Sequence, residues 1–155
     1  TPHCDPDVRA ALVGLAASHT RAHLVRAVME GVAFSLCESL DIFADLDVPV
    51  QSIRAGGGGA RSSLWRAILA ATFDHSVDTV VAEEGAAYGA ALLAGVGVGL
   101  WPSVDAACKA VVHAATSTPA NAADVITMRS RYGAYRRLYP ALHAMTSHAA
   151  TSVPE

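Results

Sequence analysis

The clearest pattern of polar and apolar positions in this chain lies between residues 20 and 46. At 100° per residue the charged side chains fall within about a third of a helix circumference: Arg26, Glu30, Glu38, Asp41 and Asp45. The remaining positions are mostly Leu, Val, Ala, Met, Ile and Phe, and Thr20 is a suitable N-terminal cap. One narrow polar stripe indicates burial on two or more sides, so the pattern predicts a long central helix.

A shorter pattern predicts a strand, a helix and a second strand. Val50–Ala55 and the β-branched segment Ser76–Val81 are typical of strands. The helix between them is expected to begin at Ser62 or Ser63, since apolar residues follow at helical spacing: Leu64, Trp65, Ile68, Leu69 and Phe73. Such a unit of about 30 residues forms a right-handed crossover with a parallel strand pair.

The carboxyl ends of both predicted strands carry segments suited to a ligand. Ligands of parallel sheets collect at these ends, where Gly56–Gly59 follow the first strand and Glu83–Gly85 follow the second. Bare glycine backbone can approach a flat ring or a phosphate closely, and the first turn of the next helix has unpaired N–H groups. We therefore expect a nucleotide here; the alternative is a tight turn without a ligand.

Two common phosphate-binding loops do not fit the glycine run. A Walker loop needs a lysine beside its last glycine, and the only lysine is Lys109. The dinucleotide fingerprint needs a third glycine, and its two possible registers place Arg61 or Ser62 there.

The C-terminal half is predicted to be largely helical. Gly85–Val96 is rich in glycine and alanine, and each helical glycine costs about 1 kcal/mol, so either another backbone approaches closely or the helix packs on this domain's own sheet. Ser103 is expected to cap a helix that ends at Val112, Thr116–Asn121 to form a loop, and Ala122–Met145 to form a last helix that Pro140 could break. In that helix arginines (Arg129, Arg131, Arg136, Arg137) alternate with Tyr132, Tyr135 and Tyr139. We interpret this pattern as a solvated face with packed tyrosines rather than a nucleic-acid surface.

Composition narrows the function classes. Hydrophobic residues make up 52% of the 155 residues, charged residues only 16%, and the mean hydropathy is +0.33, which suggests surface that another domain or chain covers. The net charge of −3 argues against binding to a nucleic-acid backbone. No apolar run reaches the roughly 18 residues of a membrane span. Three scattered cysteines, Cys4, Cys37 and Cys108, and seven dispersed histidines indicate neither a metal site nor a disulfide framework, and point to the cytoplasm.

Several ordered blocks of the sequence resemble one protein family. Gly56–Trp65 is similar to an adenosine motif Gly-Gly-Gly-Ala-Arg-Ser-x-x-Trp-x-Gln, and Glu84–Leu92 to the Glu-Gly-Ala-Ala-x-Gly-Ala-Ala helix that follows it. Both belong to the C-terminal domain of the FGGY-family carbohydrate kinases, most closely the xylulokinases. Three further stretches resemble the same family: Thr1–Pro6, His23–Phe34 and Tyr135–Pro140. The chain departs from the pattern at Ala67, where the motif has glutamine, and at Thr72, where an aspartate is usual; both positions bear on nucleotide affinity.

The resemblance implies an α/β fold: a partial ribonuclease-H-like lobe of the actin and hexokinase type, with a short parallel sheet that lacks its first strands. Residues 1–155 would be the C-terminal portion of the nucleotide-binding domain, with the catalytic N-terminal domain, the sugar pocket and the catalytic aspartate upstream. The intact enzyme would transfer the γ-phosphate of ATP, with Mg²⁺, to a pentulose, whereas this piece alone would be inactive. We assign no catalytic and no metal-binding residue here.

The resemblance also implies the nucleotide-binding residues. Gly57, Gly58, Gly59 and Ala60 would line the adenosine, and Ser62 or Ser63 would offer a hydroxyl to the adenine edge. Arg61 would reach a phosphate or only the surface. Two other functions are possible: a non-catalytic nucleotide-sensing module of the same half-fold, and an NAD-binding oxidoreductase. Because the strand at Val50–Ala55 would lack a neighbour, its open edge predicts self-association, for example as a homodimer, or a second fragment in the same assembly.

Overall fold

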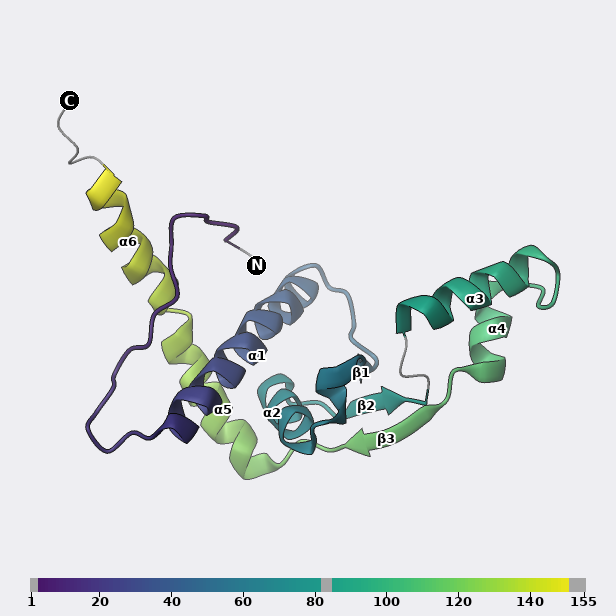
Figure 1. Ribbon diagram of the computed structural model, residues 1–155, viewed down its shortest axis with the longest axis horizontal. Helices are drawn as coiled ribbons and strands as arrows, with labels where there is room; N and C mark the ends of the chain where they lie inside the picture. The colour runs from purple at the N-terminus through teal and green to yellow at the C-terminus, as the bar shows by residue number, and fades with distance from the viewer. Residues whose placement is uncertain (1–2, 82–84, 151–155) are drawn as a thin grey trace. The chain divides into compact units, whose positions relative to one another are not determined.

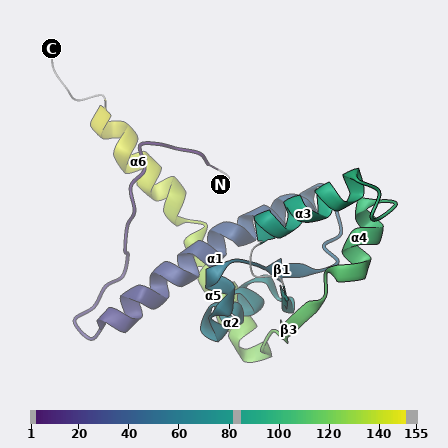
Figure 2. The ribbon, with the colours of Figure 1, turned by 45° about the vertical axis from the view of Figure 1, so that its right-hand side comes forward.

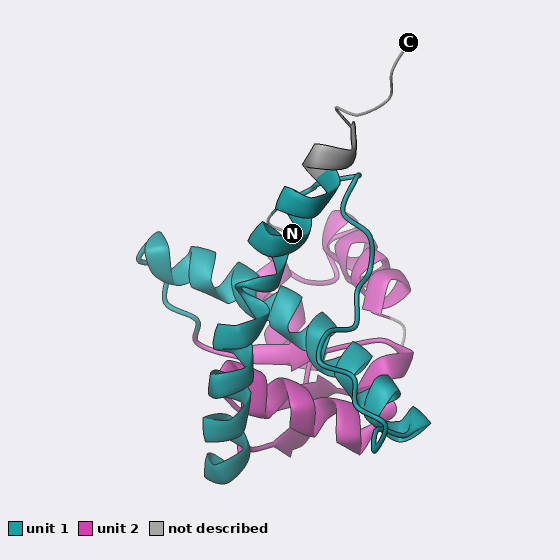
Figure 3. Ribbon diagram, turned by 90° about the vertical axis from the view of Figure 1, so that its left-hand side faces the viewer, with its two compact units in different colours: residues 1–50, 122–155 teal, residues 51–121 magenta. Residues whose placement is uncertain are grey.

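The computed structural model describes residues 3–81 and 85–150 and divides the chain into two compact units. One unit comprises residues 1–50 and 122–155, and the other comprises residues 51–121 (Figure 3). Within the described ranges the first unit contains three α-helices, and the second contains a small sheet, three α-helices and a short 3₁₀ helix.

The first unit is organised around α1 (Arg21–Asp45). As predicted, Thr20 precedes the helix, and its backbone N–H donates to Nδ1 of His23, 3.1 Å away. α1 packs against α5 (Ala122–Tyr135), which lies beside it in Figure 1. Phe34, Tyr132 and Tyr135 form an aromatic cluster between these helices, with ring centroids 5.4 to 6.3 Å apart.

The burial of α1 differs from the sequence prediction. The polar stripe lies on the packed side: Glu30 is 6% exposed and accepts hydrogen bonds from Arg26 Nε at 2.6 Å and Arg131 Nη1 at 2.7 Å. Of the apolar residues expected inside a central helix, Ala33, Phe34 and Cys37 are buried, but five others are 45% to 58% exposed: Val25, Val28, Val32, Leu36 and Phe43. The prediction of burial on two or more sides is therefore wrong in this structure, because arginines of two helices neutralise Glu30 and let the charged side pack.

The predicted last helix is two helices. α5 ends at Tyr135 and α6 spans Leu138–Ala150. The break consists of Arg136 and Arg137, the two residues between α5 and α6. Pro140 is therefore the third residue of α6 and lies in its first turn. A proline is tolerated there because the first N–H groups of a helix have no partner within it.

A short sheet forms the centre of the second unit (Figure 1). β1 (Ile53–Ala55) pairs in parallel with β2 (Val77–Val80), as predicted, and β3 (Ala114–Thr118) pairs antiparallel with the other side of β2. β3 corrects two expectations, because the sheet is mixed rather than parallel and part of the expected loop Thr116–Asn121 is a strand. Pairing with β2 decides this, and a local sequence pattern does not reveal it.

Helix α2 (Ser63–Phe73) covers this sheet and supplies most of its core. It packs against β2 and β3, and its Ile68 and Leu69 are at most 5% exposed, while Val77 of β2 is fully buried. Between β1 and α2 lies a short 3₁₀ helix, η1 (Gly58–Arg61), which the sequence did not predict.

Helices α3 (Gly85–Gly97) and α4 (Val104–Val111) lie side by side, as Figure 2 shows. The Tyr88 hydroxyl donates to the Val111 carbonyl at 3.1 Å and links them. Among the glycines of α3, the Trp101 ring covers Gly95 so closely that a Cβ would lie 2.5 Å from it, so a side chain of the same unit explains this glycine. Gly85 and Gly89 face open space, and for them the two explanations stay predictions.

Candidate nucleotide site

The glycine run forms a sharply turned backbone directly after β1. Gly57 has φ 76° and ψ −178°, a combination that is essentially restricted to glycine. The chain then enters η1, whose Ala60 N–H donates to the Gly57 carbonyl at 3.1 Å. This conformation requires glycine at position 57 for a backbone reason, independently of any ligand.

The glycine backbone is open on the side where side chains would stand. A Cβ added to Gly56, Gly57 or Gly58 would meet no atom within 4 Å, while one on Gly59 would touch the Trp65 ring at 3.6 Å. All four glycines are exposed. The turn is thus a bare main-chain surface rather than a buried strand-to-helix connection.

A cavity of about 320 Å³ lies against this surface. Its walls come from the glycine turn, from the carboxyl end of β2 and from β3, and they comprise Ala55, Gly56, Gly57, Ala60, Arg61, Arg66, Thr79, Val80, Val81, Ala115 and Thr116. The β2–β3 register shifts at Thr79 and Val80, so that Ala115 is an extra residue, and such bulges re-aim a strand at its end. The cavity therefore sits where the two parallel strands end.

A second cavity, of about 380 Å³, adjoins the first. Both are lined by Ala55, Gly56, Val80 and Val81. The second continues along α3 and α4, past Gly85, Tyr88, Gly89, Leu92, Cys108 and Val111. The glycine turn and the start of α3 thus share one hollow edge, as expected from the sequence; the predicted contribution of Glu83 and Glu84 lies outside the described residues.

The predicted nucleotide residues separate into two groups. Gly57, Ala60 and Arg61 line the first cavity, whereas Gly58, Gly59, Ser62 and Ser63 are exposed but outside its lining. The Ser62 hydroxyl oxygen accepts the Trp65 N–H at 3.2 Å and caps α2. α2 begins at Ser63, as predicted, and η1 lies between the glycine turn and this helix.

Among the cavity residues that sequence reasoning missed, Arg66 carries a charge. Arg66 of α2 donates from Nη1 to the carbonyls of Ala60 (2.6 Å) and Arg61 (3.1 Å), and from Nε to the Thr118 hydroxyl (3.1 Å). A lone arginine inside a helix carries no signal of such a role. Its position between Trp65 and Ala67, within the adenosine motif, is the only hint in the sequence.

The two departures from the family pattern have simple surroundings. Ala67 is exposed, and Thr72 donates from its hydroxyl to the Ile68 carbonyl at 2.8 Å. Within residues 3–81 and 85–150 no group of three or more His, Cys, Asp or Glu side chains could hold a metal ion. In the same ranges no helix is long and apolar enough to cross a membrane.

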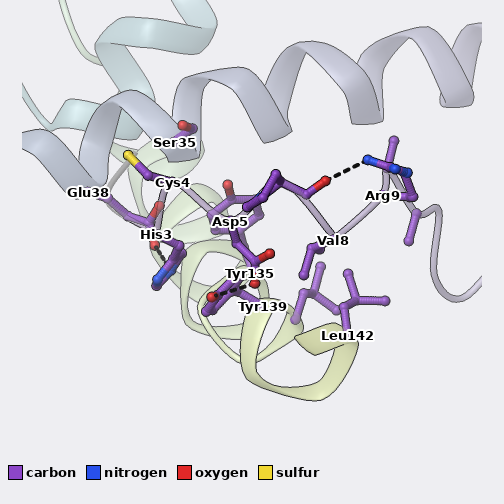
Figure 4. A pocket seen from close by; sticks show the side chains of 14 residues that line it. His3, Cys4, Asp5, Val8, Arg9, Ser35, Glu38, Tyr135, Tyr139 and Leu142 are labelled. Atoms are coloured by element: carbon purple, nitrogen blue, oxygen red, sulfur yellow. Dashed lines mark hydrogen bonds and ion pairs between the residues drawn. The ribbon is translucent and has the colours of Figure 1, made fainter. Parts of the chain in front are cut away.

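The first unit contains a larger cavity, of about 510 Å³, with a polar cluster (Figure 4). The Asp5 carboxylate accepts hydrogen bonds from the Tyr139 hydroxyl at 3.0 Å and contacts His143 Nδ1 at 2.7 Å. The His3 ring stacks on Tyr139 with centroids 3.5 Å apart. Asp5 and His3 thus attach the N-terminal segment to α6 through Tyr139 and His143.

Comparisons with known proteins fit the site in the second unit. The C-terminal domain of the FGGY family of carbohydrate kinases matches residues 1–98. The chain belongs to this family. Xylulose kinase from Bacillus subtilis is 33% identical over 139 residues, which cover 90% of this chain and 28% of that protein. Glycerol kinase from Bordetella parapertussis is 40% identical over 105 residues, covering 67% of this chain and 21% of that protein.

The fold agrees with this assignment. The crystal structure of xylulose kinase from Rhodospirillum rubrum matches with a TM-score of 0.75 and 30% identity, covering 86% of this chain and 27% of that one. The helix-rich α/β architecture is therefore that of FGGY kinases, whose ATPase lobes are of the actin and hexokinase type. The comparisons give no support to a sensing module or an NAD-dependent oxidoreductase. The chain spans less than a third of the length of these relatives.

Proposed function

We propose that this chain is the nucleotide-binding part of an ATP-dependent sugar kinase, with the purine nucleoside of ATP resting on the backbone of Gly56 and Gly57. The observation that carries the proposal is the open glycine surface at the joined carboxyl ends of β1 and β2. Bare backbone below and small apolar side chains beside it, Val80 and Ala115, suit a flat heterocycle.

ATP and Mg²⁺ fit this site to different degrees. The glycine surface suits the nucleoside, and bound ATP would supply the γ-phosphate that a kinase transfers to a sugar hydroxyl. In the described ranges no side-chain cluster suits Mg²⁺, so the ion would be held by the phosphates and by residues of other segments. Arg61, exposed at the cavity wall, would face either a phosphate or solvent.

The sugar is proposed from the relatives. Xylulose kinases cover up to 97% of the chain, so we propose a pentulose such as xylulose as the acceptor. The glycerol kinase match covers a smaller share. We further propose that residues 1–155 are the C-terminal portion of the nucleotide-binding domain, and that the sugar pocket and catalytic base belong to an N-terminal domain. We also propose that the enzyme works in the cytoplasm, in keeping with three cysteines that form no disulfide.

Nucleotide binding is tested by substituting the glycine surface. Gly56 lines both cavities and has open space at its Cβ position, so Gly56→Leu should fill the nucleoside space without a clash and weaken ATP binding about tenfold or more. Gly133→Leu is the matched control, since Gly133 is an exposed glycine of α5 with equally open space. The measurement is an NMR titration with ATP that follows the amides of Gly56–Gly59.

The proposal is supported if ATP changes the chemical shifts of these amides, and if these changes are lost in Gly56→Leu and retained in Gly133→Leu. Shifts confined to other residues, or none at millimolar ATP, overturn it. In a coupled assay for ADP release, we expect no turnover of xylulose by this chain alone, and turnover by a protein that also carries the N-terminal domain.

A further inference from the structure

Arg66 contacts both η1, which follows directly on the glycine turn, and the sheet. No local sequence pattern predicts these contacts. Arg66 is the fourth residue of α2, is half-buried and lines the first cavity. Its guanidinium contacts two backbone carbonyls, which belong to η1, and one hydroxyl, which belongs to β3. One side chain of α2 thus joins η1 to β3.

The two carbonyls lie at the C-terminal end of η1, in Ala60 and Arg61. Side chains commonly donate to the last carbonyls of a helix. Nη1 of Arg66 lies 2.6 and 3.1 Å from these two carbonyl oxygens. A hydrogen bond from a charged donor is roughly twice as strong as a neutral one, so Arg66 fixes where η1 ends.

The position of η1 in turn fixes the glycine surface. Ala60 N–H bonds to the Gly57 carbonyl and Ser62 N–H bonds to the Gly59 carbonyl, so any shift of η1 moves both glycines. The Nε contact to Thr118 anchors the guanidinium to β3, which bears Ala115 and Thr116 on the opposite wall of the cavity. The two walls are therefore held at one spacing by Arg66.

We propose that Arg66 is a positioning residue for the nucleotide: it holds the glycine turn at a fixed distance from β3 and so sets the width of the nucleoside cavity. This inference rests on the proposed function. Arginine suits the role because its rigid planar fork directs several donors at once, whereas a lysine offers a single mobile ammonium.

The test compares variants that remove different contacts of this residue. Arg66→Gln should lose both carbonyl contacts, raise the hydrogen-exchange rates of the Gly58–Ser62 amides about tenfold or more, and weaken ATP binding by a similar factor. Thr118→Val removes only the anchor on β3, so we expect a smaller change of about two- to threefold. Arg66→Lys keeps the charge and should behave like Arg66→Gln; it also serves if Arg66→Gln does not fold.

Two readouts separate the inference from the proposed function. Hydrogen exchange at residues 58–62 reports on positioning without a ligand, and ATP titration of the unaltered chain reports on nucleotide binding. If ATP binds the unaltered chain, and Arg66→Gln or Arg66→Lys changes neither exchange nor affinity, the inference about Arg66 is wrong while the proposed function stands. If ATP does not bind the unaltered chain, the proposed function fails, and the nucleotide role of Arg66 fails with it.

A merely structural role gives a different pattern. In that case Arg66→Gln would lower the thermal unfolding midpoint and raise exchange throughout the second unit, including Val77 and Ile68 at its core. Exchange that rises only at residues 58–62, with an unchanged midpoint, supports positioning. A uniform rise overturns it.

Discussion

At the scale of single residues, Gly57 is the glycine of the turn whose backbone conformation excludes other residues most strongly. Its φ of 76° and ψ of −178° lie in a region that costs a residue with a Cβ about 1–3 kcal/mol. Gly58 differs because its φ is outside the left-handed range, while a Cβ at either position would meet no atom within 4 Å. The four glycines look alike in the sequence, yet the structure distinguishes them.

We therefore expect Gly57→Ala to lower the free energy of unfolding by about 1–3 kcal/mol. Gly58→Ala should change it by no more than about 0.5 kcal/mol. Urea unfolding of both variants, followed by circular dichroism, measures the difference. Equal stabilities for the two variants would show that Gly57 does not adopt the described conformation.

At the scale of elements, the Asp5 carboxylate links the N-terminal segment to α6, beside the stacked rings of His3 and Tyr139. The pKa of Asp5 is lowered from 3.8 to about 2, mainly because the Asp7 backbone N–H donates to it, and also because His143 and Tyr139 do. Burial raises the pKa of the Tyr139 hydroxyl, and the hydrogen bond from this hydroxyl to Asp5 raises it further.

The lowered pKa of Asp5 predicts a local dependence on pH. Because the folded carboxylate has the lower pKa, its contribution to stability is complete above about pH 4 and is lost as the pH falls toward 2. A carbon-13 NMR titration of the Asp5 carboxyl group should give the low pKa, with the Asp7 amide shifting in the same range. In Asp5→Asn that amide step should disappear. A titration midpoint near 3.8 in the unaltered chain would contradict the attachment.

At the scale of the whole molecule, two surfaces remain open. Within the described residues β1 pairs only with β2, so its other edge is free, and an open edge invites pairing with another chain. Several apolar side chains of α1 are also exposed. These exposed apolar side chains of α1 contribute to the high hydrophobic content from which the sequence predicted a covered surface.

We expect the isolated chain to self-associate through the edge of β1. Light scattering should give a mass above 16.0 kDa that rises with concentration. Ser52→Pro, just before β1, should weaken association because proline removes a backbone donor at the edge. Val28→Glu on α1 is the comparison. A monomer at all concentrations, or association lost only in Val28→Glu, would exclude the edge of β1 as the interface.

The sequence predicted the local features of this chain well. Helix α1, the β1–α2–β2 unit, α3 and α4 follow from side-chain periodicity, caps and glycines, which act over a few residues. The glycine turn and the ordered family motifs likewise indicated a nucleotide site at the carboxyl ends of the strands, and the structure places a cavity there.

By itself, then, the sequence determined the helices α1 to α4, the two parallel strands β1 and β2, and the family that the chain resembles. Only the tertiary structure decided that the charged side of α1 is packed, that residues 114–118 form a third strand, and that Arg66 contacts the end of η1 and β3. The physical reason is sequence separation. Glu30 contacts Arg131, β2 pairs with β3, and Arg66 contacts Thr118, and the contacting residues are 37 to 101 positions apart in the sequence. A local sequence pattern does not predict such distant partners.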